Sequence, residues 1–344
     1  MAPEPGEPVV RPSAFFAAPR RRPTTYPGTA PDYPYLLADG LVQPLRVERV
    51  AGSVRVTLAD GTPVDDVLRR HGVAPLAGRI PSVAYGANRG PESLALKFDH
   101  HGSAEAPPIA PVVPVLAVTV SDVDAVGGGI TKQGFVYADI VDSPGTRLSV
   151  LLPLFDRRQL AAVHDSEGVG KGYDCAWLTG IDLTARGGGS AGTLAAMAYV
   201  RPAPVFRDPR DDQPLAFAAV AAEGRRFPAL HQVAMLARVV EATGIAARLA
   251  PLLGRRPDGE DLRAEAVAED LIRLLNGQWW YRRHNRPDDG LVAAARAFTI
   301  VNDAMAGSPW PRPPDSPLTR DVLPRDEAYD PPPARQLGHL LPLV

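Results

Sequence analysis

The apolar residues of this chain change their spacing near Pro228, and that change limits the folds open to it. Between about residues 78 and 225 they form short runs bounded by glycine and proline, as in β-strands. Downstream, Leu230, Val233 and Val240 recur at helical spacing. The two patterns occupy separate segments, so we expect strands with few helices first and helices afterwards.

The central segment offers strand candidates separated by turn signals. A strand is expected to run into a turn within 80–88, and further strands are expected at 114–122, 134–142, 148–155 and 193–200. Turns are expected at 127–129, 143–145 and 187–189. Short helices are expected at 91–98, where Pro91 suits the first position, and within 156–168. Strands mixed with few short helices predict an α+β fold with a curved or barrel-like sheet.

Proline-rich stretches and changes of period predict the organisation of the whole chain. Two alternating runs around Ala51 and Gly52 predict a β-hairpin. The expected segments are a proline-rich arm, disordered or wrapped on the surface, over 1–35, a β-hairpin and helix over 36–77, the main domain over 78–225, a helical extension over 226–308 and a proline-rich tail over 309–344.

Composition excludes several classes of function. The formal net charge of −2 gives no reason to expect nucleic acid or an anionic membrane as a partner. No apolar run approaches the roughly 18 residues that a membrane span needs, and the N-terminus lacks the order of a secretory signal, so we expect a cytoplasmic protein. Cys175 is the only cysteine, which excludes an intramolecular disulfide and a cysteine-based zinc site.

A compact turn, Tyr85-Gly86-Ala87-Asn88, lies between a strand candidate and a helix start. Such a turn leaves backbone N–H groups unpaired beside the positive end of a helix, where a carboxylate or an oxyanion binds well. Gly86 permits close approach, and Asn88 adds an amide side chain. An ordinary turn with a helix cap is the alternative interpretation.

The segment from Asp165 to Val169 places Glu167 beside a glycine, after a short helix. In a pocket this carboxylate could shuttle a proton, with Tyr173 as a nearby hydrogen-bond donor. A solvated, inert glutamate is the alternative. Cys175 could serve as the nucleophile of an acyltransferase or amide hydrolase, although a small buried residue is the simpler interpretation.

Taken in order, these segments resemble the γ-glutamylcyclotransferase family. That family has a tyrosine-glycine-serine-asparagine turn after its first strand, here residues 85–88, and an acidic segment ending in glutamate-glycine-valine, here Glu167 to Val169. A tyrosine follows, here Tyr173, and a later strand carries another, here Tyr199. The resemblance covers roughly residues 78 to 225. Ala87 stands where the family has serine, and the hairpin and C-terminal helices lie outside the family core.

The resemblance implies a mixed β-barrel around a cavity, with no metal and no organic cofactor. It implies that the α-amine of a γ-glutamyl compound attacks its own side-chain carbonyl, which gives 5-oxoproline and a free amine. Glu167 would be the general acid and base, and Tyr85, Gly86, Ala87, Asn88, Tyr173 and Tyr199 would bind the small-molecule substrate. A non-catalytic binding or scaffolding protein on the same fold is the alternative, and the C-terminal helices are candidates for a homodimer interface.

Overall fold

The structure is a computed structural model that describes residues 18–19, 21–100, 108–201, 205–256, 262–283, 289–306, 316, 318 and 321–344. Its strands are β1 (Tyr35–Ala38), β2 (Leu41–Val50), β3 (Ser53–Leu58), β4 (Ile80–Val83), β5 (Val113–Ile130), β6 (Val136–Phe155), β7 (Asp174–Thr184), β8 (Ser190–Val200), β9 (Arg207–Asp208), β10 (Gln213–Pro214), β11 (Ala216–Phe217), β12 (Ala222–Glu223) and β13 (Ala229–Leu230).

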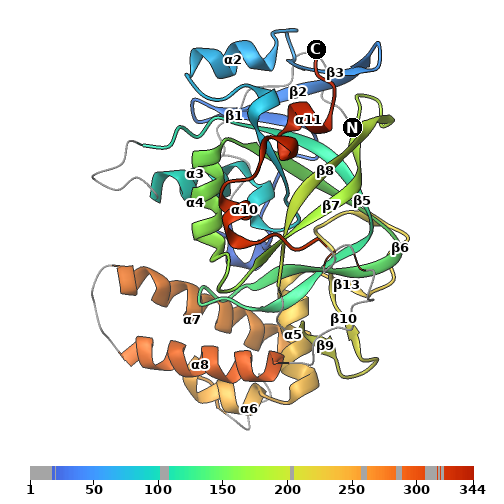
Figure 1. Cartoon of the computed structure of the whole chain (residues 1–344). Coiled ribbons are helices and arrows are strands. Elements are labelled where there is room, and N and C mark those ends of the chain that lie inside the picture. Colours follow the sequence, from blue (N-terminus) through green and yellow to red (C-terminus); the bar gives the residue numbers. More distant parts are fainter. Residues whose placement is uncertain are drawn as a thin grey trace.

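The helices lie mainly outside the sheet (Figure 1). The α-helices are α2 (Val64–Arg70), α3 (Pro91–His100), α4 (Arg157–Glu167), α5 (Gln232–Thr243), α6 (Ala246–Leu249), α7 (Ala264–Arg283), α8 (Asp289–Met305), α10 (Arg325–Tyr329) and α11 (Leu337–Leu340). The 3-10 helices are η1 (Pro23–Thr25), η2 (Leu76–Gly78), η3 (Ala87–Arg89), η4 (Ala250–Leu253) and η5 (Pro333–Arg335).

One large sheet organises the molecule. Its order includes β6–β4–β8–β7–β5, and β5 also pairs with β6, so the pairings trace a partial ring. The β4–β8 pair is parallel, whereas the other pairs of this ring are antiparallel. The α+β class is confirmed. The closed barrel that the resemblance implies is not confirmed, because the structure establishes only this partial ring.

The expected turns at 127–129 and 143–145 are wrong, because β5 and β6 run through both positions. The glycines of β5 allow close packing instead of a turn. A Cβ at Gly127 would lie 2.6 Å from Sδ of Met235, and one at Gly129 would lie 2.6 Å from the hydroxyl of Tyr137. The connection lies at 131–135, where Gly134 has a φ of +88°.

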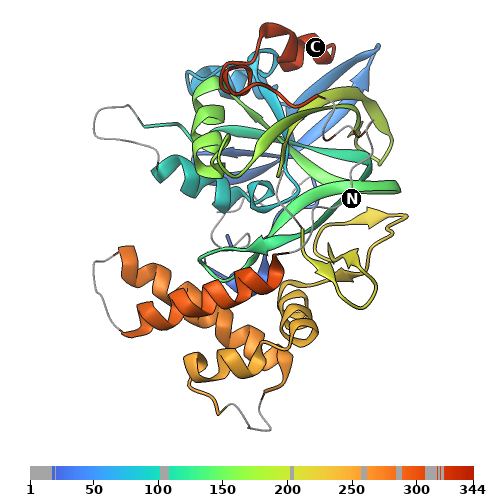
Figure 2. The same cartoon turned by 60° about the horizontal axis from the view of Figure 1, so that its bottom comes forward.

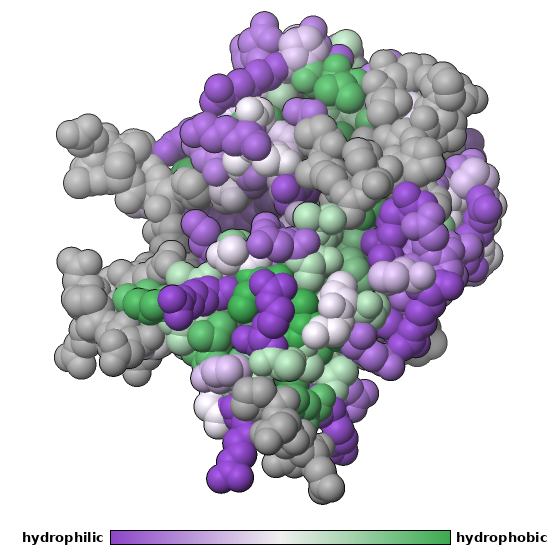
Figure 3. All heavy atoms as spheres, turned by 90° about the horizontal axis from the view of Figure 1, so that it is seen from below, coloured by the Kyte–Doolittle hydropathy of each residue, from purple (hydrophilic) through white to green (hydrophobic). Residues whose placement is uncertain are grey.

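The predicted hairpin and C-terminal helices are confirmed. Strands β2 and β3 pair around Ala51 and Gly52, and β1 adds a third strand. Helix α5 ends at Gly244, which has a left-handed φ of +63°. Helices α5 to α8 gather below the sheet (Figures 1 and 2). Seen from below, hydrophobic residues reach the surface among hydrophilic ones (Figure 3), and Val292 of α8 is 58% exposed.

The described part of the C-terminal segment returns to the sheet. Val322 forms a bridge with Ala176 of β7, and Leu343 forms a bridge with Val54 of β3. Between these points α10 lies against α4. Residues 1–17 of the predicted arm and 309–315 of the predicted tail lie outside the described residues, and the predicted segment boundaries stay predictions.

A buried arginine anchors the beginning of α4. The guanidinium of Arg79, next to β4, donates to the carbonyl of Leu154 at 2.9 Å and to Oε1 of Gln159 at 3.1 Å. Burial lowers the pKa of Arg79 to about 10. Gln159 also forms a capping box with Asp156. These bonds fix the start of the helix that ends in Glu167. Among the described residues, no helix is long and apolar enough to cross a membrane.

Candidate active site

A cavity of about 460 Å³ lies where four parts of the chain meet. They are the turn after β4, the end of α4, the β5–β6 connection and the N-terminal arm. The lining includes all of the predicted site residues: Tyr85, Gly86, Ala87, Asn88, Glu167, Tyr173 and Tyr199. The structure therefore brings them together, while their roles in binding and catalysis stay predictions. We call this space the site cavity.

Glu167 is the last residue of α4, which stops because Gly168 adopts a left-handed φ of +70°. Its side chain is 21% exposed and forms an ion pair with Lys97. Oε1 of Glu167 also accepts a hydrogen bond of 3.1 Å from Nδ2 of Asn88. The other oxygen, Oε2, has no hydrogen-bond partner within the described part of the chain. One carboxylate oxygen is thus held in place and the other is open to a ligand.

Lys97 was missed by the sequence analysis. It lies on α3, which begins three residues after the turn, and its side chain is 14% exposed. Besides the ion pair, its ammonium donates to Oγ of Ser166 at 2.7 Å. The available signal was composition, because the chain has only three lysines and this one falls on the helix that follows the turn. Its position counters the negative end of the α4 dipole, where a carboxylate is otherwise unfavourable.

The turn itself presents unpaired polar groups. The backbone N–H groups of Gly86 and Asn88 donate to no acceptor among the described residues. Oδ1 of Asn88 is buried and likewise has no hydrogen-bond partner there. A buried polar group without a partner is costly, so a ligand that supplies one is favoured. The turn can therefore donate to an oxyanion or carboxylate and accept from an ammonium.

Tyrosines and one histidine form the wall behind the turn. The hydroxyl of Tyr85 donates to the carbonyl of Tyr199. The hydroxyl of Tyr199 lies 2.9 Å from Nδ1 of His164, whose Nε2 lies 2.9 Å from the carbonyl of Ala328 in α10. A carbonyl only accepts, so Nε2 carries the proton and Nδ1 accepts from Tyr199. Burial lowers the pKa of His164, which favours this neutral form.

The tyrosine hydroxyls of the cavity remain protonated. Burial raises the pKa values of Tyr85, Tyr173 and Tyr199, and the charge of Glu167 adds to each increase. Tyr173 donates to the carbonyl of Ala138 at 3.3 Å. These groups are therefore neutral hydrogen-bond donors and do not act as bases.

The charge of the cavity lining is positive on balance. Its cationic side chains are Lys97, Lys132 and Arg201, against the single carboxylate of Glu167. The guanidinium carbon of Arg201 lies 4.3 Å from the ring centre of Tyr137 and 5.3 Å from that of Tyr173. A lining of this charge suits an anionic ligand.

Cys175 does not belong to this lining. It is buried in a separate hydrophobic cluster, and burial raises the pKa of its thiol to about 12. The thiolate that nucleophilic catalysis needs is therefore disfavoured. The cysteine-based alternative finds no support in the geometry.

Three solved structures show a limited likeness to this chain. An uncharacterized protein from Homo sapiens is 16% identical with a TM-score of 0.27, over 36% of this chain and 67% of the other. A gamma-glutamyl cyclotransferase is 17% identical with a TM-score of 0.27, over 36% of this chain and 66% of the other. A protein from Arabidopsis thaliana is 13% identical with a TM-score of 0.26, over 36% of this chain and 70% of the other. No protein-family model and no curated protein matches the chain. Similarity at these TM-scores does not assign a function to the site cavity.

Proposed function

We propose that this protein is a γ-glutamylcyclotransferase-like enzyme, which converts a γ-glutamyl amine to 5-oxoproline and releases the amine. The observation that carries the proposal is the shared cavity: Glu167, whose Oε2 has no hydrogen-bond partner among the described residues, lines the same cavity as Gly86 and Asn88, whose N–H groups donate to no described acceptor. A proton acceptor and oxyanion donors are the two groups that this reaction requires.

The reaction balances with the residues present. The nitrogen of the neutral α-amine of the substrate attacks the γ-carbonyl carbon and gives a proton to Oε2 of Glu167 as the bond forms. A bond forms between these two atoms, and the bond from the carbonyl carbon to the leaving nitrogen breaks. Glu167 returns the proton to that nitrogen. Because nucleophile and carbonyl belong to one molecule, fixing a reactive conformation supplies a large part of the rate enhancement.

Several neighbours support these roles. Oδ1 of Asn88 is a buried acceptor that suits an N–H of the substrate α-amine, while its Nδ2 holds Oε1 of Glu167. Lys97 holds the same carboxylate through the ion pair. The cationic side chains of Lys132 and Arg201 suit the α-carboxylate that every γ-glutamyl compound carries. The proposed barrel would enclose this cavity and exclude bulk water from the intermediate.

The alternative is a non-catalytic protein that binds the same class of small molecule. The Lys97–Glu167 ion pair favours this alternative, because the pair stabilises a fixed carboxylate without any turnover. A homodimer through the C-terminal helices stays a separate proposal, for which the exposure of Val292 is the relevant observation.

A substrate panel tests the proposal. Purified protein is incubated with γ-glutamyl amines and γ-glutamyl peptides, and 5-oxoproline is measured by mass spectrometry. We expect release of 5-oxoproline with at least one compound. If a folded sample gives none, while calorimetry shows that it binds members of the panel, the binding protein replaces the enzyme as the conclusion.

A further inference from the structure

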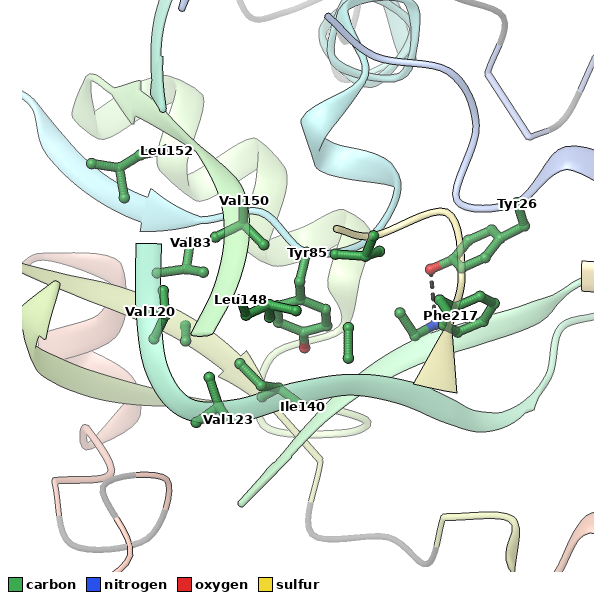
Figure 4. Close-up of a cluster of buried hydrophobic side chains, with 14 of the residues drawn as sticks. Tyr26, Val83, Tyr85, Val120, Val123, Ile140, Leu148, Val150, Leu152 and Phe217 are labelled. Atoms are coloured by element: carbon green, nitrogen blue, oxygen red, sulfur yellow. Dashed lines mark hydrogen bonds between the residues drawn. The ribbon is translucent and has the colours of Figure 1, made fainter. Parts of the chain in front are cut away.

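The N-terminal arm brings a tyrosine into the site cavity. Tyr26 is only 6% exposed, and its ring stacks on Phe135 with centroids 5.0 Å apart and an angle of 13°. The ring centre of Phe217 lies 5.4 Å from that of Tyr26, with the two rings tilted (Figure 4). The sequence places this residue in the proline-rich arm, which was expected to be disordered or wrapped on the surface. Packing between aromatic rings instead fixes the hydroxyl of Tyr26 in the cavity wall.

The hydroxyl of Tyr26 lies directly beside the turn. A Cβ built at Gly86 would lie 3.0 Å from this oxygen, so the glycine makes room for it. The oxygen accepts a hydrogen bond of 2.9 Å from the N–H of Ala138 on β6, which Figure 4 shows as a dashed line. Burial raises the pKa of Tyr26, so the hydroxyl keeps its proton.

That proton has no acceptor in the described part of the chain. A tyrosine hydroxyl donates one hydrogen bond and accepts others, and here the N–H of Ala138 uses an acceptor position. A buried donor without an acceptor is costly unless a ligand or water supplies one. Because Tyr26, Gly86 and Glu167 line the same cavity, a ligand held by the turn is the natural acceptor.

We infer that Tyr26 is a further catalytic residue, whose hydroxyl donates a hydrogen bond to the γ-carbonyl oxygen of the ligand as negative charge develops on it. The inference rests on the proposed function, and it makes the N-terminal arm part of the active site. The arm is fixed nearby, since the N–H of Ala18 donates to Glu92 on α3, and Arg21 forms an ion pair of 2.6 Å with the same carboxylate.

The substitution Tyr26→Phe tests the inference, because it removes the hydroxyl and keeps the ring. We expect kcat to fall about 100-fold with KM changed less than about threefold, as for loss of an oxyanion donor. Tyr35→Phe is the matched control. Tyr35 is also fully buried and its hydroxyl donates to the carbonyl of Arg89 at 2.9 Å, but it does not line the cavity. We expect the control to lower the melting temperature and leave kcat unchanged.

Binding of 5-oxoproline separates this inference from the proposed function. We expect Tyr26→Phe to weaken its affinity about fivefold in calorimetry, the loss of one ordinary hydrogen bond. If the wild type turns over substrate and Tyr26→Phe matches it in kcat and in this affinity, the inference is overturned and the function stands. If the wild type binds 5-oxoproline without turning over any substrate, and Tyr26→Phe weakens binding, the protein is not an enzyme for this reaction. The hydrogen bond from Tyr26 to the ligand is then still supported. A wild type that neither binds nor reacts overturns both.

A spectroscopic readout covers the case in which Tyr26→Phe does not fold. Fluorotyrosine placed at position 26 keeps both ring and hydroxyl. We expect its fluorine NMR signal to move when 5-oxoproline is added, and a fluorotyrosine at position 35 to stay unmoved. An unmoved signal at position 26 under saturating 5-oxoproline overturns the inference.

Discussion

A hydrogen bond of 3.1 Å joins Nδ2 of Asn88 to Oε1 of Glu167, although 79 residues separate them. Asn88 belongs to the turn after β4, and Glu167 is the last residue of α4. The two long strands β5 and β6 lie between them in the chain. The bond therefore fixes the distance between a carboxylate and the turn N–H groups, and that distance decides whether one ligand can reach both. The same carboxylate is held from a third element, α3, by Lys97.

Replacing Glu167 by Gln should abolish turnover while the protein stays folded. Gln keeps the size of the side chain but takes no proton from an attacking amine, so kcat should fall by about 10² to 10⁴. Asp165→Asn is the control, because that carboxylate lies on the same helix, accepts from Tyr329 and is not part of the cavity lining. Steady-state release of 5-oxoproline and the melting temperature check both variants. Equal activity of Glu167→Gln and wild type would remove Glu167 from the mechanism.

Replacing Lys97 by Met should lower kcat about tenfold and leave the fold intact. The substitution removes the cation that orients Oε1 of Glu167 and leaves only Asn88 to hold it. Because the two side chains are only 14% and 21% exposed, the substitution leaves a largely buried carboxylate without its cation, so the melting temperature should fall although the protein stays folded. Lys171→Met is the control, since Lys171 is exposed and outside the cavity lining. A Lys97→Met variant as active as Lys171→Met would show that the ion pair is dispensable.

The sequence predicted those helices and turns that are determined by residues within the same segment. The helix from Gln232 to Thr243 repeats apolar residues every three to four positions and stops at a glycine, and both features act within one element. The turn at 85–88 and the carboxylate at 167 were likewise found from their own segments. Their meeting in one cavity depends on the partial ring of strands, which the order of motifs indicated only through the resemblance.

Local sequence patterns do not predict contacts between segments that are distant in the chain. The glycines at 127–129 predict a turn because glycine permits one, but in the structure they make room for the ring of Tyr137 and the sulfur of Met235. Tyr26 is in a proline-rich arm with no apolar period, so nothing near it in the chain indicates burial. The partners that set these roles, Met235 for Gly127 and Ala138 for Tyr26, each lie more than a hundred residues away in the chain, and only the fold reveals them.

Replacing Gly128 by Ala should destabilise the protein by about 1–3 kcal/mol, since overpacking forces neighbours to move. A Cβ there would collide with the ring of Tyr137, which lines the cavity beneath Arg201. Activity should therefore fall together with stability. Gly189→Ala is the control, because no atom lies within 4 Å of a Cβ at that position. Chemical denaturation of both variants measures the difference, and equal midpoints would contradict the close packing described here.

Alkylation of the thiol should leave activity unchanged. Cys175 is buried, and burial raises its pKa to about 12, with further contributions from Asp174 and Glu167. Little thiolate is present near neutral pH, so iodoacetamide should modify the folded protein slowly. Cys175→Ala should likewise retain turnover, with some loss of stability from the smaller side chain. Rapid loss of activity in proportion to alkylation would restore the cysteine mechanism.

The stability of the protein should fall as the pH drops through the titration of His164. Burial lowers the pKa of this histidine below its ordinary value of 6.5, although the Ala328 carbonyl and the charges of Asp165 and Glu167 oppose the shift. Between the two pKa values the unfolded chain binds a proton that the folded protein does not, so lower pH favours unfolding. His164→Gln removes that difference, while Gln can still donate to Ala328 or accept from Tyr199.

We therefore expect the melting temperature of the wild type to fall more than that of His164→Gln between about pH 7.5 and about pH 5.5. His339→Gln, at an exposed position, should behave as the wild type does. Parallel curves for wild type and His164→Gln would show that His164 does not titrate differently on folding.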